Sequence, residues 1–595
     1  MKTIEFETDN QTVLKHPFIG DVLVLDCETD SLDTEEAKVK FLGFYSYKFK
    51  KYYICHQDEK QAMEHLINEH KILVGFNNKQ FDHPVMQNLI NGLDLTYKIC
   101  FDCLAVLYDY ERKRPNREVI IKLADGRTLQ EALPNRKLRT VGEVLGFSVA
   151  KGEINYKIFQ KDWWTEEELK EIYTYLIKDL AVTRRIFEFF ITYFDNFREY
   201  VPEDNVRKLN YIRSSTGSFA YSVLSHLAGI ELVFEDDPVK LKLKPVNHGG
   251  FVLPPQVDYA EGIIIDADFA SLYPHIMFMC NLFSPMTKHE PGSWNGGKLF
   301  DLQTGYRCDQ LGKIEAVLKQ LFMQRLQFKK EKDPREKALK IVINSIYGLS
   351  GSPIFKNVFN MTTSGDCTAI GRKMIQYTKQ CFEDAGMKVQ YSDTDSCFVH
   401  MPPGKTMEDF QAVADQAIKE ILFNVPFPVD TFKMAVEDVF VKIWFFKKKH
   451  YAGFNQRGEL TVKGLSVIKH DASHLGKLIF EKLKPIMVEK QNIKFSRDFI
   501  KDMIDEEIRN DITLVGQLYN VKNPSSYKSF TSIQCQIAQA FGEGSHILIP
   551  NKSLGPVGKD KKYCSVSDAD KLSVDDLFLD KVWSELEPFI DDGGK

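Results

Sequence analysis

Hydrophobic and polar positions in the first 195 residues follow two alternating patterns. The apolar runs DVLVLDCE (21–28) and KILVGFN (71–77) predict buried strands. The stretch TEEELKEIYTYLIKDLAVTRRIFEFF (165–190) predicts a long helix, and its first turn carries a capping box because Glu168 follows Thr165 at the third position. Strands that alternate with helices indicate an α/β domain over residues 1–195.

The remaining sequence predicts a connection and then a second, α+β region. Proline and glycine concentrate in PVKLKLKPVNHGGFVLPPQVDYAEG (238–262), which is typical of a linker or hinge between domains. After it come a predicted strand (IIIDADF, 263–269), a pair of helices joined at Asp333-Pro334, and two apolar runs that meet at YSDTDS (391–396) as a hairpin. The chain is therefore expected to be multidomain.

The composition indicates a folded protein, since 43% of the residues are hydrophobic and 27% are charged. The net charge is only −5, with 78 Lys and Arg against 83 Asp and Glu. Locally the balance differs: residues 311–340 hold nine basic and four acidic side chains, residues 441–470 seven and one, and residues 565–595 three and nine. Two basic patches suit a protein that follows a phosphate backbone in one groove, although solvated surface charge explains either patch alone.

Secretion and membrane insertion are not expected. The N-terminus MKTIEFETDNQT lacks an apolar signal core, and no window approaches the roughly 18 apolar residues of a membrane helix. The eleven cysteines include one CxxC pair, Cys100 and Cys103, without a second pair to complete a zinc site, so reduced thiols and an intracellular, cytoplasmic location are predicted.

Paired carboxylates form the first chemical signal. Asp393 and Asp395 in YSDTDS would project to one face of a period-2 hairpin, and two adjacent carboxylates favour a divalent cation such as Mg²⁺. An Asx-rich turn is the alternative, but five fixed positions of YxDTDS have a chance frequency of only about 10⁻⁴ in a chain of this length. Asp266 and Asp268 leave the strand 263–269 on the same face, and periodicity does not choose between them.

A helical face supplies the second signal. At helical spacing Lys340, Asn344 and Tyr347 share one face, and the opposite face is apolar, with Leu339, Val342, Ile343 and Ile346. A cation, an amide and an aromatic ring on one face could hold a triphosphate and stack on a base. Taken alone, the segment is better explained as an amphipathic surface helix with a stray Tyr.

Together, and in this order, three segments resemble the polymerase motifs of family B DNA polymerases: DFASLYP (268–274, DxxSLYP), KIVINSIYG (340–348, Kx3NSxYG) and YSDTDS. The resemblance covers residues 20 to about 475 and implies a right-hand polymerase with palm, fingers and thumb, following an RNase H-like exonuclease domain. It implies that Asp268 and Asp395, with Phe269, hold two Mg²⁺ ions, for which Mn²⁺ can substitute, and that Asp393 supports the site.

The resemblance also assigns the nucleotide and primer contacts. Arg325 and Lys329, one helical turn apart, would join Lys340 in neutralising the triphosphate. Tyr273 would stack under the incoming sugar and exclude a 2′-OH, and the remaining expected nucleotide contacts are Asn344, Tyr347, Ser271 and Leu272. Lys449 and Tyr451, in KKKHYAGF, resemble the KxY motif that contacts the primer strand.

The N-terminal domain resembles the 3′→5′ exonuclease of the same family. Asp26 and Glu28 alternate onto one side of a strand, residues 77–82 (NNKQFD) fit the pattern N-x3-F-D that ends at Asp82, and Tyr175 and Asp179 are i,i+4 neighbours on a helix. The resemblance implies two metals held by the four carboxylates, with Tyr175 orienting the attacking water. It assigns DNA contacts to Asn77, Phe81 and Lys151.

Two positions depart from the family pattern. The linker reads Asn247-His248-Gly249-Gly250, where the family has Tyr before the glycine pair, and Gly249 and Gly250 are still expected to contact DNA. His275 stands where Ser usually follows SLYP.

The sequence thus predicts a DNA-directed DNA polymerase with proofreading exonuclease, replicative in a phage or virus and active in the host cytoplasm. The expected domains are 1–195 exonuclease, 196–310 linker and first part of the palm, 311–351 fingers, 352–470 second part of the palm, and 471–595 thumb with an acidic tail. Expected partners of the monomer are primer-template DNA, dNTPs and a processivity factor or replisome protein at the C-terminal region. The rival functions are a nuclease with a DNA-binding scaffold and a non-enzymatic replication subunit, and the intact carboxylates argue against both.

Overall fold

The computed structural model describes residues 1–5, 11–31, 33–112, 119–122, 128–131, 136–145, 154–244, 247–283, 288–290, 305–307, 310–333, 335–469, 472–521, 532–542, 544–552, 562–569 and 573–591. The chain divides into two compact units. The first comprises Met1–Asn247, Tyr273–Lys288 and Cys308–Cys367, and the second comprises His248–Leu272, His289–Arg307 and Thr368–Lys595.

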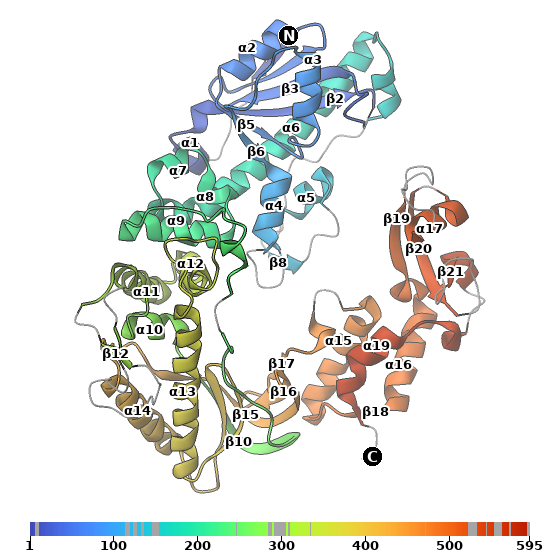
Figure 1. The fold of residues 1–595 in the computed structure, drawn as a ribbon. Coiled ribbons are helices and arrows are strands. Elements are labelled where there is room, and N and C mark those ends of the chain that lie inside the picture. Colours follow the sequence, from blue (N-terminus) through green and yellow to red (C-terminus); the bar gives the residue numbers. More distant parts are fainter. Residues whose placement is uncertain are drawn as a thin grey trace. The chain divides into compact units, whose positions relative to one another are not determined.

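A six-stranded sheet organises the start of the first unit (Figure 1). Its strand order is β1 (Lys2–Glu5), β4 (Lys51–His56), β3 (Val39–Ser46), β2 (Val22–Thr29), β5 (Ile72–Gly75) and β6 (Ile99–Asp102). The pairing is antiparallel from β1 to β2 and parallel from β2 through β5 to β6. The expected α/β domain is confirmed.

Both faces of this sheet are covered, so β3 is buried along its whole length. On one face, Leu42 and Phe44 share a core with α2 (Lys60–Asn68) and α3 (Asp82–Leu89). On the other face, Phe41 packs with α6 (Glu166–Phe194) and the 3₁₀ helix η2 (Tyr156–Gln160). The capping box of α6 is present, since Thr165 Oγ1 accepts from the Glu168 amide at 3.2 Å and Glu168 accepts from the Thr165 amide at 3.0 Å.

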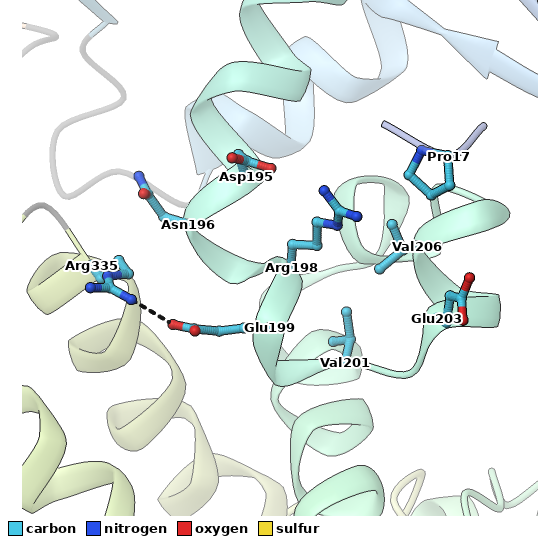
Figure 2. A pocket seen from close by; sticks show the side chains of 9 residues that line it. All are labelled: Pro17, Asp195, Asn196, Arg198, Glu199, Val201, Glu203, Val206 and Arg335. Carbon is cyan, nitrogen blue, oxygen red and sulfur yellow. Dashed lines mark hydrogen bonds and ion pairs between the residues drawn. The ribbon is translucent and has the colours of Figure 1, made fainter. Parts of the chain in front are cut away.

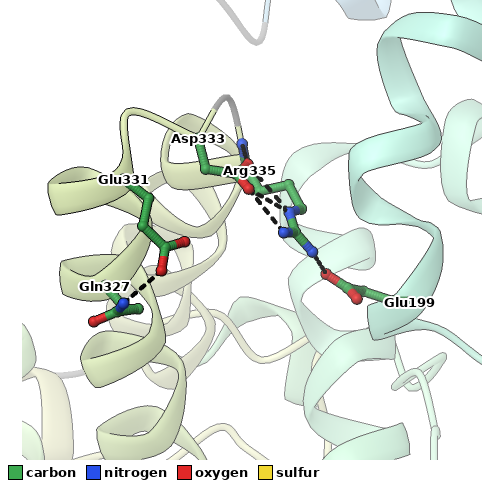
Figure 3. Close-up of polar contacts among 5 residues, drawn as sticks. All are labelled: Glu199, Gln327, Glu331, Asp333 and Arg335. Atoms are coloured by element: carbon green, nitrogen blue, oxygen red, sulfur yellow. Dashed lines mark hydrogen bonds and ion pairs between the residues drawn. The ribbon is translucent and has the colours of Figure 1, made fainter.

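Helices make up most of the rest of this unit: η3 (Asp195–Tyr200), α7 (Glu203–Arg207), α8 (Asn210–Arg213), α9 (Thr216–Ala228), α10 (Leu272–Met279), α11 (Lys313–Glu331) and α12 (Arg335–Ser350). As the sequence predicts, Leu339, Val342, Ile343 and Ile346 are buried, and α12 packs against α9 and α11. In the turn between α11 and α12, the Asp333 carboxylate accepts a hydrogen bond from the backbone amide of Arg335 at 2.8 Å. The Arg335 guanidinium also forms ion pairs with Asp333 and with Glu199 of η3 (Figure 3).

The second unit is built on a seven-stranded antiparallel sheet. Its order is β17 (Leu460–Lys463), β16 (His450–Asn455), β15 (Met434–Lys447), β10 (Tyr259–Phe269), β14 (Ser396–His400), β13 (Lys388–Asp393) and β9 (Val252–Leu253). The predicted hairpin at YSDTDS is β13–β14. The predicted linker is shorter than expected, because β9 pairs with β13 and β10 already begins at Tyr259.

The C-terminal part contributes α15 (His474–Lys490), α16 (Arg497–Asn510), α19 (Asp580–Leu586) and a small sheet of β19 (Gln517–Val521), β20 (Gly544–Asn551) and β21 (Lys562–Ser565). The apolar residues of the acidic tail lie in a core with α15 and α16: Leu577, Val582, Leu586, Phe589 and Ile590. These side chains hold the tail in place. Among the described residues, no helix has both the length and the apolar character needed to cross a bilayer.

Candidate active sites

Three carboxylates converge in the first unit. Asp26 and Glu28 lie on one side of β2, and Asp179 faces them from α6; ligand oxygens of the three lie within 4.8 Å of one another. Glu28 and Asp179 are buried, and Asp179 is only 1% exposed. Carboxylates held this close repel unless a cation lies between them, and their hard oxygen atoms fit Mg²⁺ or Mn²⁺.

The fourth expected carboxylate, Asp82, does not join this group. It is the first residue of α3, and its Oδ1 accepts from the backbone amide of Cys27 in β2 at 3.0 Å. Burial raises the pKa of Asp82 to about 6. Asp82 therefore lies in the wall of the same cavity, bound to the strand that carries Asp26 and Glu28. The structure brings three of the four expected carboxylates within ligand distance of one another, and a metal-binding role for Asp82 stays a prediction.

The cavity at these carboxylates has a volume of about 940 Å³. Tyr175, Asn77 and Phe81 line it, as the sequence predicts. Burial and the charges of Glu28 and Asp179 raise the pKa of Tyr175, so its hydroxyl stays protonated. Asn77 takes a left-handed conformation (φ 65°), and its backbone N–H donates a hydrogen bond to Asp102 Oδ1 at 3.0 Å.

Five lining residues of this cavity matter for the site although sequence reasoning did not select them: Tyr156, Arg136, Lys137, Leu138 and Arg139. The hydroxyls of Tyr156 and Tyr175 lie 3.0 Å apart, and the Arg136 guanidinium stacks on Tyr108 at 4.6 Å. The run RKLR (136–139) was the available signal for a basic wall. Lys151 lies outside the described residues.

A second cavity of the first unit, of about 610 Å³, contains none of the expected site residues (Figure 2). Its wall mixes Asp195, Glu199 and Glu203 with Arg198 and Arg335. Arg335 is already paired with Glu199 and Asp333 there. The mixed signs of charge favour neither an anion nor a cation.

In the second unit, strand pairing brings Asp268 beside Asp395. Asp268 lies opposite Ser396 in the β10–β14 pairing, and the amide of Phe269 donates to the carbonyl of Asp395 at 2.8 Å. Asp395 occupies the turn between β13 and β14, so the period-2 argument for Asp393 and Asp395 is wrong. The neighbouring strand β10, and not alternation within the hairpin, assembles the site.

This arrangement is electrostatically strained without a cation. Burial, followed by the charges of Asp395 and Asp266, raises the pKa of Asp268 to about 8, and burial raises the pKa of Asp395 to about 6. Asp268 Oδ1 is buried and has no hydrogen-bond partner. A divalent metal would satisfy that oxygen and neutralise the pair, so the residues present fit a metal site.

The register separates Asp266 from Asp268. Asp266 lies opposite Phe398 on one side and Asp438 on the other, whereas Asp268 is adjacent to the turn that carries Asp395. Burial and the charges of Glu437 and Asp438 raise the pKa of Asp266 to about 7. The structure therefore pairs Asp268, and not Asp266, with Asp395.

Asp393 is neutralised within the protein. Lys449 Nζ lies 3.3 Å from its Oδ1, which also accepts from Thr394 Oγ1 at 3.1 Å. Lys449 takes a left-handed turn conformation (φ 65°) and its amide donates to the Tyr391 hydroxyl at 2.8 Å. Tyr451 packs on Phe398 with ring centroids 5.0 Å apart. Asp393 thus has the contacts of a supporting residue.

The linker around Gly249 and Gly250 packs within the second unit, and Gly250 and Phe251 contact the same turn. The Gly249 carbonyl accepts from Arg372 Nη1 at 2.5 Å, and the Phe251 carbonyl accepts from the Thr394 amide at 2.7 Å. Gly250 lies directly against Thr394. The linker is therefore packed on the carboxylate turn within the second unit.

The expected nucleotide contacts divide between the units. Ser271 (φ 56°) and the buried Leu272 belong to the second, and Tyr273 begins the next segment of the first. The rings of Tyr273 and Tyr347 are in contact, with centroids 4.8 Å apart and planes inclined by 34°. Lys340 and Asn344 are exposed on α12, and Lys329 is exposed on α11.

Arg325 differs from its neighbours. It is buried between α11 and α12, and its Nε donates to Glu336 at 2.8 Å. The expectation that Arg325 meets a triphosphate is therefore not matched by its position in this structure, because Glu336 already neutralises the guanidinium. His275, the other departure from the family, is a core residue that packs on Phe322 with ring centroids 4.5 Å apart.

Comparison with known proteins identifies both halves. The family model for DNA polymerase family B matches residues 211–520, more than half of the chain, and the model for the RNase_H superfamily matches residues 23–191. The expected order of an RNase H-like domain followed by a polymerase domain is confirmed.

Individual proteins similar to this chain are named DNA polymerases. The DNA polymerase of Archaeoglobus fulgidus is 24% identical over 476 residues, which are 77% of this chain and 58% of that protein. DNA polymerase 1 of Pyrococcus abyssi is 27% identical over 409 residues, 64% of this chain and 50% of that protein. The chain thus spans about half the length of these relatives. The structure of the family B DNA polymerase from Pyrobaculum calidifontis shares the fold, with a TM-score of 0.50 at 18% identity over 96% of this chain and 77% of that one. The chain belongs to DNA polymerase family B.

Proposed function

We propose that the protein is a DNA-directed DNA polymerase that extends the 3′ end of a primer and removes mispaired 3′ ends with its own exonuclease. One observation carries the proposal: β10 and the β13–β14 turn place Asp268 beside Asp395 with a buried carboxylate oxygen that lacks a partner. Two such carboxylates at the end of a sheet suit the binding of metal ions for phosphoryl transfer.

At the polymerase site, Asp268 and Asp395 would hold two Mg²⁺ ions. When bound, the ions lower the pKa of the primer 3′-OH and stabilise charge on the phosphorus and the leaving pyrophosphate. Phe269 can contribute only its carbonyl, because its amide bonds Asp395 and its ring stacks on Phe432 at 5.2 Å. Lys449 and Asp393 hold the turn in place.

For the incoming nucleotide, we assign triphosphate binding to Lys329, Lys340 and Asn344, and stacking to Tyr347 and Tyr273. Arg325 would take part only after leaving Glu336. Ser271 and Leu272 shape the strand end after Asp268. The exposed Lys329 of α11 and the exposed Lys340 of α12 support the charge role, since each ammonium group can neutralise a phosphate oxygen.

At the exonuclease site, Asp26, Glu28 and Asp179 would hold metal ions, with Asp82 joining them on release of the Cys27 amide. The Tyr175 hydroxyl would orient the attacking water, and Asn77 and Phe81 would hold the terminal nucleotides. Single-stranded ends would be the substrate, because a frayed mismatch is the end that unpairs at least cost.

We assign residues 1–195 to the exonuclease, 196–310 to the linker and first palm segment, 311–351 to the fingers, 352–470 to the second palm segment, and 471–595 to the thumb and tail. Primer-template DNA and dNTPs are the proposed partners. The relatives named above are archaeal, and they give the expected phage or viral source no support. The source, monomeric state, processivity factor and cytoplasmic location stay predictions.

Two variants test the proposal by separating the activities. Asp395→Asn should abolish dNTP incorporation on a primed template and leave single-strand degradation near wild type. Asp26→Ala with Glu28→Ala should do the reverse. The exposed carboxylates Asp430 and Glu64 supply matched controls, as Asp430→Asn and Glu64→Ala. Incorporation that survives in Asp395→Asn, or a folded variant that loses both activities, would contradict the assignment, as would activity in the presence of a metal chelator.

A further inference from the structure

Asn247 and Tyr347 are one hundred positions apart and share a hydrogen bond. The side-chain amide of Asn247 donates to the Tyr347 hydroxyl at 2.8 Å. Both residues belong to the first unit, of which Asn247 ends the first segment. Asn247 is also the position at which the linker departs from the family pattern. The residue that differs is therefore the one that contacts the proposed nucleotide-binding face of α12.

Tyr347 is held at its backbone and at its ring face. Its backbone belongs to α12, and its carbonyl accepts from Ser350 Oγ at 2.7 Å. Its ring lies on Tyr273, with centroids 4.8 Å apart and planes inclined by 34°. The Tyr273 backbone is held in turn, since its carbonyl accepts from Cys367 Sγ at 3.8 Å.

The phenol end is where Asn247 acts. A tyrosine side chain on a helix has two main torsions, and a ring that contacts another ring can still slide across it. A hydrogen bond at the hydroxyl removes that freedom, because it fixes the far end of the ring. Burial raises the pKa of Tyr347, so the hydroxyl stays protonated and neutral.

We propose that Asn247 is a positioning residue that fixes the Tyr347–Tyr273 ring pair and so sets the affinity and sugar selectivity for the incoming nucleoside triphosphate. This inference rests on the proposed function and extends it to a residue that touches no reacting atom. Without the bond, the two rings would sample more arrangements, and each nucleotide would have to order them on binding. Binding should therefore weaken more than the chemical step slows.

The test compares four proteins in single-nucleotide incorporation on a primed template: wild type, Asn247→Ala, Tyr347→Phe and the double variant. Tyr347→Phe keeps the ring and its stack and removes only the hydroxyl. We expect each single variant to raise KM for the dNTP about fivefold, the effect of one hydrogen bond worth about 1 kcal/mol, with kcat within about twofold of wild type. The double variant should be no worse than either single one, because both remove the same bond. The preference for dNTP over the matching ribonucleotide should fall in all three.

A matched control and a rescue accompany the series. Asn357→Ala removes another exposed asparagine amide, which donates to the Glu231 carbonyl at 2.8 Å in the same unit, and should leave KM unchanged. Asn247→Asp provides an oxygen that can accept from the Tyr347 hydroxyl, and should restore KM only while that hydroxyl is present. Single-strand degradation reports folding and should be equal in every variant.

Several outcomes overturn the inference. A wild-type KM and sugar preference in Asn247→Ala would contradict it. So would a rise in KM of the double variant equal to the product of the two single rises, or a loss of single-strand degradation as large as the loss of incorporation. A wild-type chain that incorporates no nucleotide would overturn the proposed function and this inference together. If incorporation is lost in Asp395→Asn but KM and sugar preference are unchanged in Asn247→Ala, the inference is wrong and the proposed function stands.

Discussion

Gly250 and Thr394 are in such close contact that a Cβ atom at position 250 would lie 2.6 Å from Thr394 Oγ1. Thr394 has φ 61° and sits between Asp393 and Asp395. Because a β-branched side chain in a tight turn has little room to move, the linker and the carboxylate turn form one packed structure. A glycine is required at 250 by this close approach.

Gly250→Ala should therefore damage incorporation and spare degradation. The added methyl group must push Thr394, and with it the Asp395 carboxylate, so we expect kcat/KM for dNTP incorporation to fall about tenfold or more, since small displacements at a reacting centre have large effects. Gly249→Ala is the matched control. Gly249 has φ 70° but no heavy atom within 4 Å of an added Cβ, so that variant should lose only about 1 kcal/mol of stability. Equal losses of incorporation in both variants would contradict this account.

Metal binding at the polymerase site should release a proton. Burial and neighbouring charge raise the pKa of Asp268 to about 8, so at pH 7 the metal-free carboxyl is mostly protonated, and a divalent ion binds only the ionised form. The apparent affinity should therefore rise with pH up to about pH 8, by at most about tenfold per pH unit, and level off above it. Calorimetric titration of Mn²⁺ in two buffers of different ionisation enthalpy would count the protons, in a protein whose exonuclease site is removed by Asp26→Ala and Glu28→Ala. Binding at pH 7 without proton release would count against the raised pKa.

The sequence predicted most of the fold because its strongest patterns are local. The capping box at Thr165, the apolar face of α12 and the hairpin at YSDTDS depend on neighbours within a few residues, and each is confirmed. The family resemblance named Asp268 and Asp395 together, whereas periodicity alone left Asp266 and Asp268 open and grouped Asp395 with Asp393. What joins Asp268 to Asp395 is a strand pairing across more than one hundred positions.

The errors have the same origin. Nothing local shows that Glu336 pairs with Arg325, or that the Cys27 amide binds Asp82, since both contacts form only when separate elements pack together. Arg136 and Arg139 were overlooked because their role appears only when the segment meets the cavity of Asp26 and Asp179. Site residues with motif spacing were predictable, and those that depend on tertiary contacts were not.

The basic wall of the exonuclease cavity should bind the backbone of the single strand. Arg136→Ala and Arg139→Ala should each raise KM for single-strand degradation, because the wall supplies positive charge beside the three carboxylates. The slope of log KM against log salt should fall by about 0.7 for each phosphate that the variant no longer neutralises. Arg207→Ala removes an exposed arginine of the same unit that is paired with Glu203, and serves as the control. An unchanged salt slope in both wall variants would show that these residues do not meet phosphates.

Lys449 should influence synthesis through Asp393 as well as through DNA. Its ammonium group lies 3.3 Å from Asp393 Oδ1 and its side chain is 62% exposed, so it can neutralise the carboxylate and still meet a primer phosphate. Lys448, the preceding residue, is an exposed lysine of the same turn, and Lys448→Ala removes an equal charge. Both variants should weaken primer-template binding by a similar factor, since each loses one cation near the backbone. Only Lys449→Ala leaves Asp393, which lies beside Asp395, without its cation. This variant should therefore slow incorporation further and lower the ratio of synthesis to degradation.

The measurement is the ratio of extension to degradation on one labelled primer, at DNA concentrations that saturate each variant. If saturating DNA restores Lys449→Ala to the ratio of Lys448→Ala, Lys449 acts on DNA alone and the ion pair with Asp393 has no part in catalysis.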